Sequence, residues 1–278
     1  MAEEYEHIAY RQQGSVGIIT LNRPERLNAW TTPMEHSVKR AVLAAASDDS
    51  LRAIVITGAG RGFCAGAEME LLQGASAASA TRREAEKPAA AASELDAELS
   101  TPYPGRFGYL LSVGKPIIAA INGPCAGIGF VLTLFCDLRW ASEQAMFTTA
   151  FAKRGLIAEH GSSWLLPRLI GPARALDLML SARRVQAAEA AAIGLVNDTF
   201  AHATFMEDVL ARLRALTDEV SPRSMAVIKA QLWKSLSQSF DVALEVADRE
   251  MRKSFTSADF KEGVAHFVEK RAPRFTGR

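Results

Sequence analysis

The stretch that decides the fold is "KPIIAAINGPCAGIGFVLTLFCD", residues 115–137. Its pattern predicts a buried strand over residues 115–123, then a glycine-bearing bend and an apolar helix. A proline at the start of a strand costs no ladder hydrogen bond, so Pro116 is compatible with this assignment. The N–H groups of Gly127, Ile128 and Gly129 would then lie at a helix N-terminus, where unsatisfied donors and the helix dipole favour negative charge.

Strands alternate with helices on both sides of this stretch. "SVGIITLN" (15–22) and "LRAIVITG" (51–58) are β-branched runs that end in turn residues. The segment between them has a helical period, with Thr31 or Thr32 as its cap and Pro33 in its first turn. Further strands are expected at "CDLRWAS" (136–142), "AMFTT" (145–149) and "LVNDTF" (195–200). This alternation predicts parallel pairing and an α/β fold.

The pattern changes along the chain. After Ser162 most segments are amphipathic helices, which divides the sequence into a core of residues 1–200 and a helical region of residues 201–278. Within the core, residues of about 74–106 are rich in alanine and poor in large apolar side chains. We expect a mobile helical excursion there, acting as a lid or a linker, or a surface insert without a role.

Composition limits the classes of partner. The 32 Lys and Arg residues nearly balance the 31 Asp and Glu residues, so the net charge of +1 gives no argument for nucleic acid or for an anionic membrane surface. Although 49% of residues are apolar, no apolar run approaches the ~20 residues of a membrane span. Three cysteines without metal-ligand spacing predict free thiols in a reducing compartment. We therefore expect a cytoplasmic protein without a bound metal.

A second glycine turn, "GAGRGFCAGAEM" (58–69), also follows a predicted strand. It matches neither the dinucleotide-binding motif, because Phe63 or Ala65 stands where the third glycine is required, nor a P-loop, because no Gly-Lys-Ser/Thr follows. The turn exposes N–H groups near Ala65, Gly66 and Ala67. One interpretation is a plain strand-to-helix turn; the other is that both turns aim their donors at one oxygen and form an oxyanion hole.

Seven segments of the chain resemble the enoyl-CoA hydratase/isomerase (crotonase) superfamily, in the order of that family. The resemblance implies a spiral of β-β-α units, a helical C-terminal region that builds homotrimers or hexamers as dimers of trimers, and an acyl-CoA thioester as substrate. It implies no separate cofactor, because coenzyme A is part of the substrate. The segments are "LNRPERLNAW" (21–30), "FCAGAEM" (63–69), "KPIIAAINGPCAGIGF" (115–130), "CDLRWAS" (136–142), "RGLIAEHGSSWLLPRLIGPARAL" (154–176), "AAEAAAIGLVNDTF" (187–200) and "FKEGVAHFVEKR" (260–271).

The same resemblance implies roles for individual residues. The N–H groups at Ala65 and Ile128 would hold the thioester oxygen. Arg26 would lie near the phosphates of coenzyme A, and Lys270 would reach a coenzyme A in an adjacent subunit. The other implied substrate contacts are Ala29, Ala67, Glu68, Met69, Gly127, Val131, Phe151 and His160.

The chain departs from the family where proton transfer takes place. Hydratases of the family carry two catalytic glutamates, and here their positions hold Val131 and Phe151, which cannot transfer a proton. Several double-bond isomerases of the family instead place one acid in the loop that follows "GL", and "GLIAEHGSSW" (155–164) has Glu159 there. One carboxylate can remove a proton at one carbon and return it at another while an oxyanion hole holds the dienolate. The sequence therefore favours double-bond isomerisation by Glu159.

Three other functions stay open at this point. The first is hydration of a 2-enoyl-CoA by Glu159 and a water, with His160 as a second group. The second is binding of acyl-CoA without catalysis, which the missing carboxylates suggest. The third is cleavage of a carbon–carbon or thioester bond by a water that Glu159 and His160 activate.

Overall fold

A six-stranded sheet forms the centre of the computed structural model, which describes residues 4–68 and 103–278. Its strands lie in the order β1-β2-β3-β4-β6-β9, and every pair is parallel except β1 with β2. The mostly parallel α/β class is as expected. The strand bounds are Ile8–Gln13 (β1), Val16–Leu21 (β2), Ala53–Gly58 (β3), Ile117–Ile121 (β4), Leu138–Ser142 (β6) and Asp198–Phe200 (β9).

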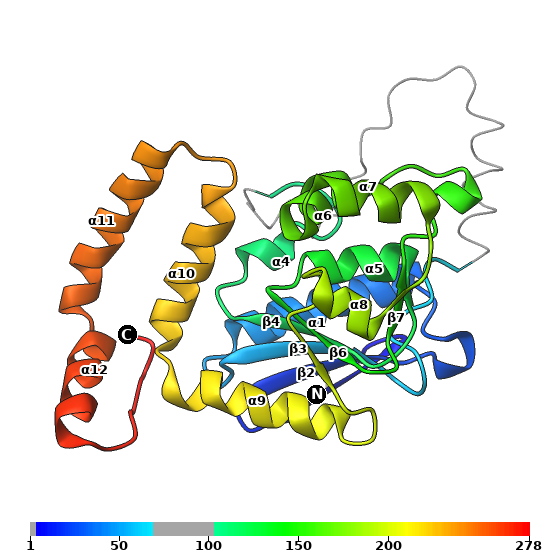
Figure 1. Cartoon of the computed structure of the whole chain (residues 1–278). Helices are drawn as coiled ribbons and strands as arrows, with labels where there is room; N and C mark the ends of the chain where they lie inside the picture. The colour runs from blue at the N-terminus through cyan, green and yellow to red at the C-terminus, as the bar shows by residue number, and fades with distance from the viewer. Residues whose placement is uncertain (1–3, 69–102) are drawn as a thin grey trace.

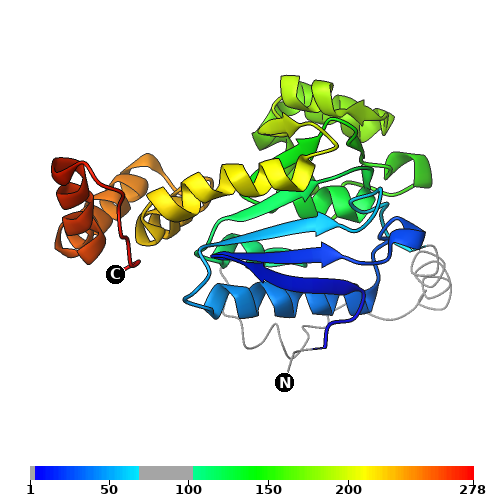
Figure 2. The same ribbon diagram turned by 90° about the horizontal axis from the view of Figure 1, so that it is seen from below.

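Both faces of this sheet are covered, because successive side chains of a strand point to opposite faces. On one face, residues such as Ile54 and Ile56 of β3 share a core with helix α1 (Thr32–Ser47). On the other face, Ala53 and Val55 of β3 pack with helix α9 (Phe205–Glu219). Figure 2 shows α1 and α9 on opposite sides of the sheet. The first residue of α1 follows Thr31, whose hydroxyl accepts the Met34 N–H at 3.2 Å, in agreement with the predicted cap.

A second, smaller sheet lies beside the main one. It consists of β5 (Cys125–Ala126), β7 (Met146–Thr148) and β8 (Val185–Gln186), in that order. The predicted strand at 145–149 therefore exists but belongs to this sheet. Helix α5 (Gly127–Leu134) starts directly after β5, so the opening stretch forms a strand, a bend and a helix as expected.

The remaining helices from Ser162 onward follow the predicted amphipathic segments, whereas α4 and the 3₁₀ turns were not predicted. The remaining helices are α4 (Tyr109–Ser112), α6 (Ser162–Ile170), α7 (Pro172–Ser181), α8 (Ala187–Ala192), α10 (Pro222–Ser235), α11 (Phe240–Thr256) and α12 (Ala258–Glu269), with short 3₁₀ turns η1 (Pro24–Arg26) and η2 (Ala152–Arg154). None of the helices in residues 4–68 and 103–278 is long and apolar enough to cross a membrane.

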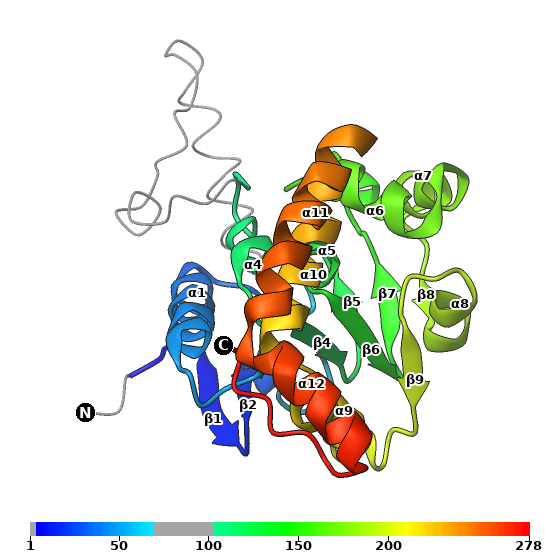
Figure 3. The ribbon, with the colours of Figure 1, turned by 90° about the vertical axis from the view of Figure 1, so that its left-hand side faces the viewer.

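The C-terminal helices extend away from the sheet. Helix α11 runs beside α10, and α12 follows it at the outer end of the molecule (Figures 1 and 3). Helix α10 is anchored to the core by the Lys229 ammonium, which lies 2.7 Å from an Asp137 carboxylate oxygen and also donates to the carbonyls of Leu110 and Lys115. By contrast, α11 buries no side chain and α12 buries only Asp259.

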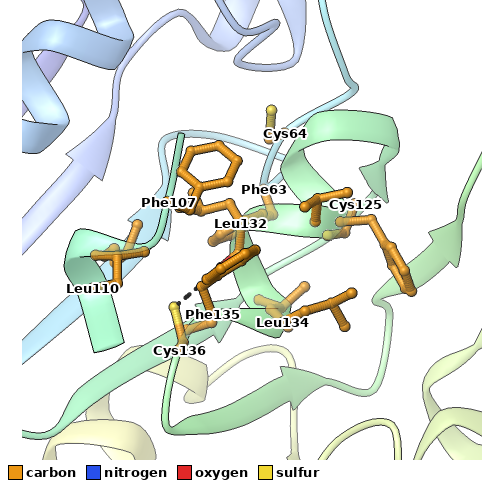
Figure 4. Close-up of a cluster of buried hydrophobic side chains, with 14 of the residues drawn as sticks. Phe63, Cys64, Phe107, Leu110, Cys125, Leu132, Leu134, Phe135 and Cys136 are labelled. Atoms are coloured by element: carbon orange, nitrogen blue, oxygen red, sulfur yellow. Dashed lines mark hydrogen bonds between the residues drawn. The ribbon is translucent and has the colours of Figure 1, made fainter. Parts of the chain in front are cut away.

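Helix α5 lies within the apolar core. Figure 4 shows its Leu132 and Leu134 together with Phe107, Phe135 and the cysteines of this region. All three cysteines, Cys64, Cys125 and Cys136, are free and buried. Burial raises the pKa of the Cys64 and Cys136 thiols to about 12. These thiols therefore stay protonated, which argues against a role as nucleophiles.

Candidate active site

Two glycine turns lie against each other. The first turn, in chain order, is formed by residues 58–69, and the second is the bend between β4 and α5. The Phe63 and Cys64 N–H groups donate to the Pro124 carbonyl at 3.0 and 3.1 Å, and the Ala126 N–H donates to the Cys64 carbonyl at 2.8 Å. Residues 64 and 125 thus form a parallel bridge between the turns. Segments that are far apart in the sequence are held together by their backbones, whichever side chains they carry.

Three glycines make this close approach feasible. Gly66 and Gly127 have φ values of +105° and +51°, which L side chains rarely adopt. A Cβ on Gly129 would lie 2.5 Å from the Cys64 Cβ and 2.7 Å from its sulfur. The first turn of α5 can therefore reach residues 64–66 only because position 129 has no side chain.

The N–H groups of the two turns have different partners. The Ala65 N–H donates to the Leu27 carbonyl at 3.0 Å, so it is already engaged within the fold. This differs from the expectation that Ala65 holds a substrate oxygen. The Ala67 N–H makes no backbone hydrogen bond to a described residue. Ile128 is the second residue of α5, where the helix itself offers its N–H no partner.

A cavity of about 300 Å³ opens beside these two residues. It gathers six of the residues that the sequence singled out: Ala67, Gly127, Ile128, Phe151, Glu159 and His160. It also contains six that the sequence did not single out as site residues: Trp30, Thr32, Glu35, Arg106, Arg154 and Leu156. The cavity therefore combines two backbone turns, apolar side chains and titratable groups.

Some predicted contacts lie outside this lining. Val131 is fully buried within α5, and Arg26 is exposed at the end of η1. Lys270 is exposed just beyond α12, at the outer end of the C-terminal helices. Met69, like most of the alanine-rich segment, lies outside the described residues. Ala65 does not line the cavity either.

Arg23 contacts both Ala29 and Glu68, two of the predicted substrate contacts. The Arg23 guanidinium donates to the Ala29 carbonyl at 3.2 Å and lies 2.8 Å from the Glu68 carboxylate. The hydrogen bond from Arg23 lowers the pKa of the Glu68 carboxyl. Arg23 therefore links residue 29 to the end of the 58–69 turn, and Glu68 does not line the cavity.

Glu159 belongs to a loop shaped by left-handed residues. Gly155, His160 and Gly161 have φ values of +69°, +51° and +81°, and α6 begins at the next residue. The Ser162 N–H donates to the Glu159 carbonyl at 3.0 Å, which fixes the backbone of the acid. The Glu159 side chain is 33% exposed, and it shares the cavity with the nearly buried Phe151 and Ile128.

Four polar side chains form a connected series of hydrogen bonds along the cavity wall, which could not be predicted from the sequence. The Arg106 Nε lies 3.0 Å from one Glu35 oxygen, and the other Glu35 oxygen accepts the Trp30 indole N–H at 3.1 Å. The Arg106 Nη1 lies 3.2 Å from the His160 Nε2. Since a guanidinium only donates, Nε2 accepts this bond and the ring proton lies on Nδ1. No spacing rule connects these residues, because Glu35 is in α1 and Arg106 precedes α4.

His160 is neutral under ordinary conditions. Burial, and secondly the charge of Arg106, lower its pKa from 6.5 to about 4. Its Nε2 lies 3.8 Å from the nearer Glu159 oxygen, which is longer than a hydrogen bond. The Glu159 carboxylate therefore accepts no hydrogen bond from the His160 Nε2. The part of the chain that the structure describes holds no cluster of three or more His, Cys, Asp and Glu residues suited to a metal.

Comparison with known proteins gives a consistent result. Residues 11–278 match the family model described as enoyl-CoA hydratase/isomerase. The 1,2-epoxyphenylacetyl-CoA isomerase of Escherichia coli K12 is 33% identical over 273 residues, which cover 98% of this chain and 99% of that protein.

Solved structures show the same similarity. Enoyl-CoA hydratase subunit I from Geobacillus kaustophilus superposes with a TM-score of 0.84 at 34% identity, covering 99% of this chain and 100% of that one. An enoyl-CoA hydratase from a Polaromonas species gives a TM-score of 0.82 at 30% identity, covering 96% and 99%. The fold is thus the crotonase fold, and the chain belongs to the enoyl-CoA hydratase/isomerase family of enzymes.

Proposed function

We propose that this enzyme moves the double bond of an enoyl-CoA, with Glu159 as the proton carrier. The observation that carries the proposal is the placement of Glu159 in one cavity with Ala67 and Ile128. The positions of the two glutamates of family hydratases hold Val131 and Phe151 here, so the two-carboxylate route to hydration is missing. Glu35 also faces the cavity, but Arg106 and Trp30 occupy both of its oxygens.

The backbone donors are the N–H groups of Ala67 and Ile128. Ala67 replaces Ala65 in this role, because the Ala65 N–H already donates to Leu27. The thioester oxygen would lie between these donors, where negative charge develops as the α-proton leaves. Removing one such donor typically costs ~3–4 kcal/mol of transition-state stabilisation.

The reaction balances with a single carboxylate. Glu159 takes a proton from C2 of a 3-enoyl thioester, and the electron pair of the C–H bond delocalises into a dienolate whose oxygen the N–H groups hold. The protonated Glu159 then returns the proton to C4, which leaves a 2-enoyl thioester and a free carboxylate. General acid–base catalysis of this kind contributes ~10²–10⁴-fold to the rate. The relative named 1,2-epoxyphenylacetyl-CoA isomerase is compatible with isomerase chemistry in this family.

Hydration of a 2-enoyl-CoA is the second candidate, since the matched solved structures are enoyl-CoA hydratases. It would use Glu159 and one water. His160 is a poor second base, because Arg106 already donates to its acceptor nitrogen. The same observation counts against a water activated by Glu159 and His160 together for bond cleavage.

Two assays on one preparation separate these functions. We expect a 3-enoyl-CoA to be converted to the 2-enoyl isomer, and a Glu159→Gln variant to lose ~10²–10⁴-fold in kcat with little change in KM. Addition of water to a 2-enoyl-CoA without bond migration would make the enzyme a hydratase. Tight binding of acyl-CoA with no turnover of either thioester would make it a silent binder.

The assembly and surroundings of the enzyme are also proposals. We propose a cytoplasmic homotrimer or hexamer, which the exposed apolar side chains of α10, α11 and α12 support. Arg26 and Lys270 are proposed contacts of coenzyme A. Because Lys270 lies beyond α12 and outside the lining of its own cavity, it would serve the cavity of a neighbouring subunit.

A further inference from the structure

A second pocket, of about 510 Å³, lies next to the catalytic cavity. Its walls are largely apolar and include Leu111, Phe135, Trp164, Leu165 and Trp233. A volume and lining of this kind suit a small apolar ligand. The second pocket and the catalytic cavity share two lining residues, Arg106 and His160. These two side chains therefore form the wall between them.

Contacts on both sides hold the wall in place. Glu35 binds Arg106 from the side of α1 and is itself held by the Trp30 indole N–H. Phe107 supports it from the core, because its ring contacts the His160 and Trp30 rings edge-on, with centroids 6.4 and 5.6 Å apart. Phe107 in turn packs against Phe135 at 5.8 Å, as Figure 4 shows. Opening the wall would break the Arg106–Glu35 ion pair, whose side chains are 37% and 25% exposed, and the exposed hydrogen bond between Arg106 and His160.

The backbone of His160 points to a specific use of its side chain. Its φ of +51° is a conformation that glycine adopts readily and that L side chains rarely adopt. A strained non-glycine residue beside a functional cavity persists where its side chain makes a compensating interaction. At His160 that interaction is the hydrogen bond from Arg106.

We propose that the Arg106–His160 wall, anchored by Glu35, limits the enzyme to short acyl groups by closing the second pocket to the acyl chain. The inference rests on the proposed function only in that the cavity binds an acyl-CoA thioester. A short acyl group stays between Glu159 and the backbone donors. A longer chain meets charged and polar side chains instead of the apolar pocket behind them, so its additional methylene groups gain no burial.

The test measures the dissociation constants of butanoyl-CoA and decanoyl-CoA by calorimetry. In the wild type we expect decanoyl-CoA to bind no tighter than butanoyl-CoA. Glycine readily adopts the backbone conformation of residue 160. In His160→Gly, the affinity for decanoyl-CoA should therefore rise at least tenfold relative to that for butanoyl-CoA, since each buried methylene group contributes about fourfold to affinity. His160→Gln keeps an acceptor for Arg106 and should behave as the wild type. A Glu35→Gln, Arg106→Ala double variant opens the wall from its other side and should reproduce the gain.

Two serines give a matched control for where the longer chain goes. Ser237 lines the second pocket, whereas Ser235, at the end of α10, lines a different groove. Both are exposed. In the His160→Gly background, Ser237→Trp should remove the gain for decanoyl-CoA and Ser235→Trp should preserve it.

An unchanged ratio of the two dissociation constants in both opened variants overturns the proposal. Weaker binding of decanoyl-CoA to Ser237→Trp in the wild-type background would also overturn it, because the acyl chain would then already occupy the second pocket when the wall is intact. Isomerase activity is measured on the same samples. If the variants discriminate by chain length but the enzyme does not isomerise a 3-enoyl-CoA, the proposal for the wall is supported and the isomerase function is rejected. If the enzyme isomerises its substrate but the ratio of dissociation constants is unchanged, the isomerase function is supported and the wall is rejected. If no acyl-CoA binds, both proposals are rejected.

Discussion

The low pKa of His160 has a consequence for stability at acid pH. The unfolded chain titrates this histidine near 6.5, and the folded chain near 4. Between these values the unfolded state binds more protons, so the free energy of unfolding falls as the pH is lowered through this window. Because the ring is partly exposed, we expect a contribution on the order of 1 kcal/mol, well below that of the full shift.

Urea unfolding at pH 7 and pH 4.5 measures this contribution. The wild type should lose about 1 kcal/mol more than His160→Gln over that range. Equal losses would mean that the imidazole is not held neutral by its surroundings. The comparison with the glutamine variant removes the effect of the carboxylates, which titrate in both proteins.

Gly129 controls how closely the two turns approach each other. A Gly129→Ala methyl group would overlap the Cys64 side chain, so the backbone must shift and the Ala67 and Ile128 donors move apart. We expect kcat to fall by ~10²-fold, as for the loss of one oxyanion donor, and stability to fall by about 1–3 kcal/mol through overpacking. Gly114→Ala is the control, because its Cβ would make an ordinary 3.4 Å contact. If kcat is unchanged in Gly129→Ala, the turns do not hold the thioester.

At the scale of residues, the sequence singled out Ile128 and Glu159, and the structure brings both to one cavity. Their roles as donor and acid stay predictions. Ile128 and Glu159 could be identified because a glycine turn and a short motif mark them. The sequence predicted Ala65 as the first donor, whereas its N–H donates to Leu27 in the structure, and we therefore propose Ala67, two residues later. N–H directions in an irregular turn depend on φ and ψ and not on residue type, so the sequence could not distinguish these two positions. Arg106 and Glu35 could not be predicted, since tertiary packing alone brings them together.

At the scale of elements, α10 depends on one buried cation. Burial lowers the pKa of Lys229, and its ion pair with Asp137 lies between the helix and the sheet. Lys229→Met removes the cation while Asp137 keeps hydrogen bonds from the Ile117 N–H and the Trp233 indole. We expect a loss of about 3 kcal/mol, at the lower end for a broken buried pair. Chemical denaturation should show this, with the exposed Lys234→Met as a control within ±0.5 kcal/mol of the wild type.

The elements that the sequence predicted are those with a long periodic pattern or a cap. Helix α1 was marked by Thr31 and Pro33, and the helices beyond Ser162 by their apolar faces. The two-residue strands β5 and β8 carry no period that a sequence could reveal. Membership of β7 in a second sheet was equally hidden, because strand pairing is decided by the path of the chain and not by the composition of the strand.

At the scale of the whole molecule, the predicted boundary between residues 1–200 and 201–278 matches a change in sequence pattern but not the way the helices pack. Helix α9 follows that boundary, yet Phe205, Val209 and Leu213 pack against the main sheet. The outward region begins only with α10, whose inner face is anchored by Lys229. Composition could show that residues 201–278 are helical, but not which of these helices the core would hold.

The outer helices lead to a prediction about assembly. Phe240, Leu232, Phe267 and Val268 are 83%, 65%, 80% and 73% exposed, and large exposed apolar surfaces mark sites of association. We expect the wild type to form trimers or hexamers at micromolar concentration, measured by light scattering after gel filtration. Phe267→Ser with Val268→Asp should dissociate them, because burial of each apolar side chain contributes about 1.5–3 kcal/mol.

The dissociated variant should keep its helical circular dichroism, because these side chains bury nothing within their own chain. If Lys270 serves the cavity of a neighbour, dissociation should also raise KM for the acyl-CoA while kcat changes little. Lys270→Ala in the assembled enzyme should then raise KM in the same way, and Lys261→Ala, on the preceding helix α12, should leave it unchanged. A wild type that is monomeric and fully active would contradict both the assembly and the shared site, since Lys270 lies too far out on the fold to serve its own cavity.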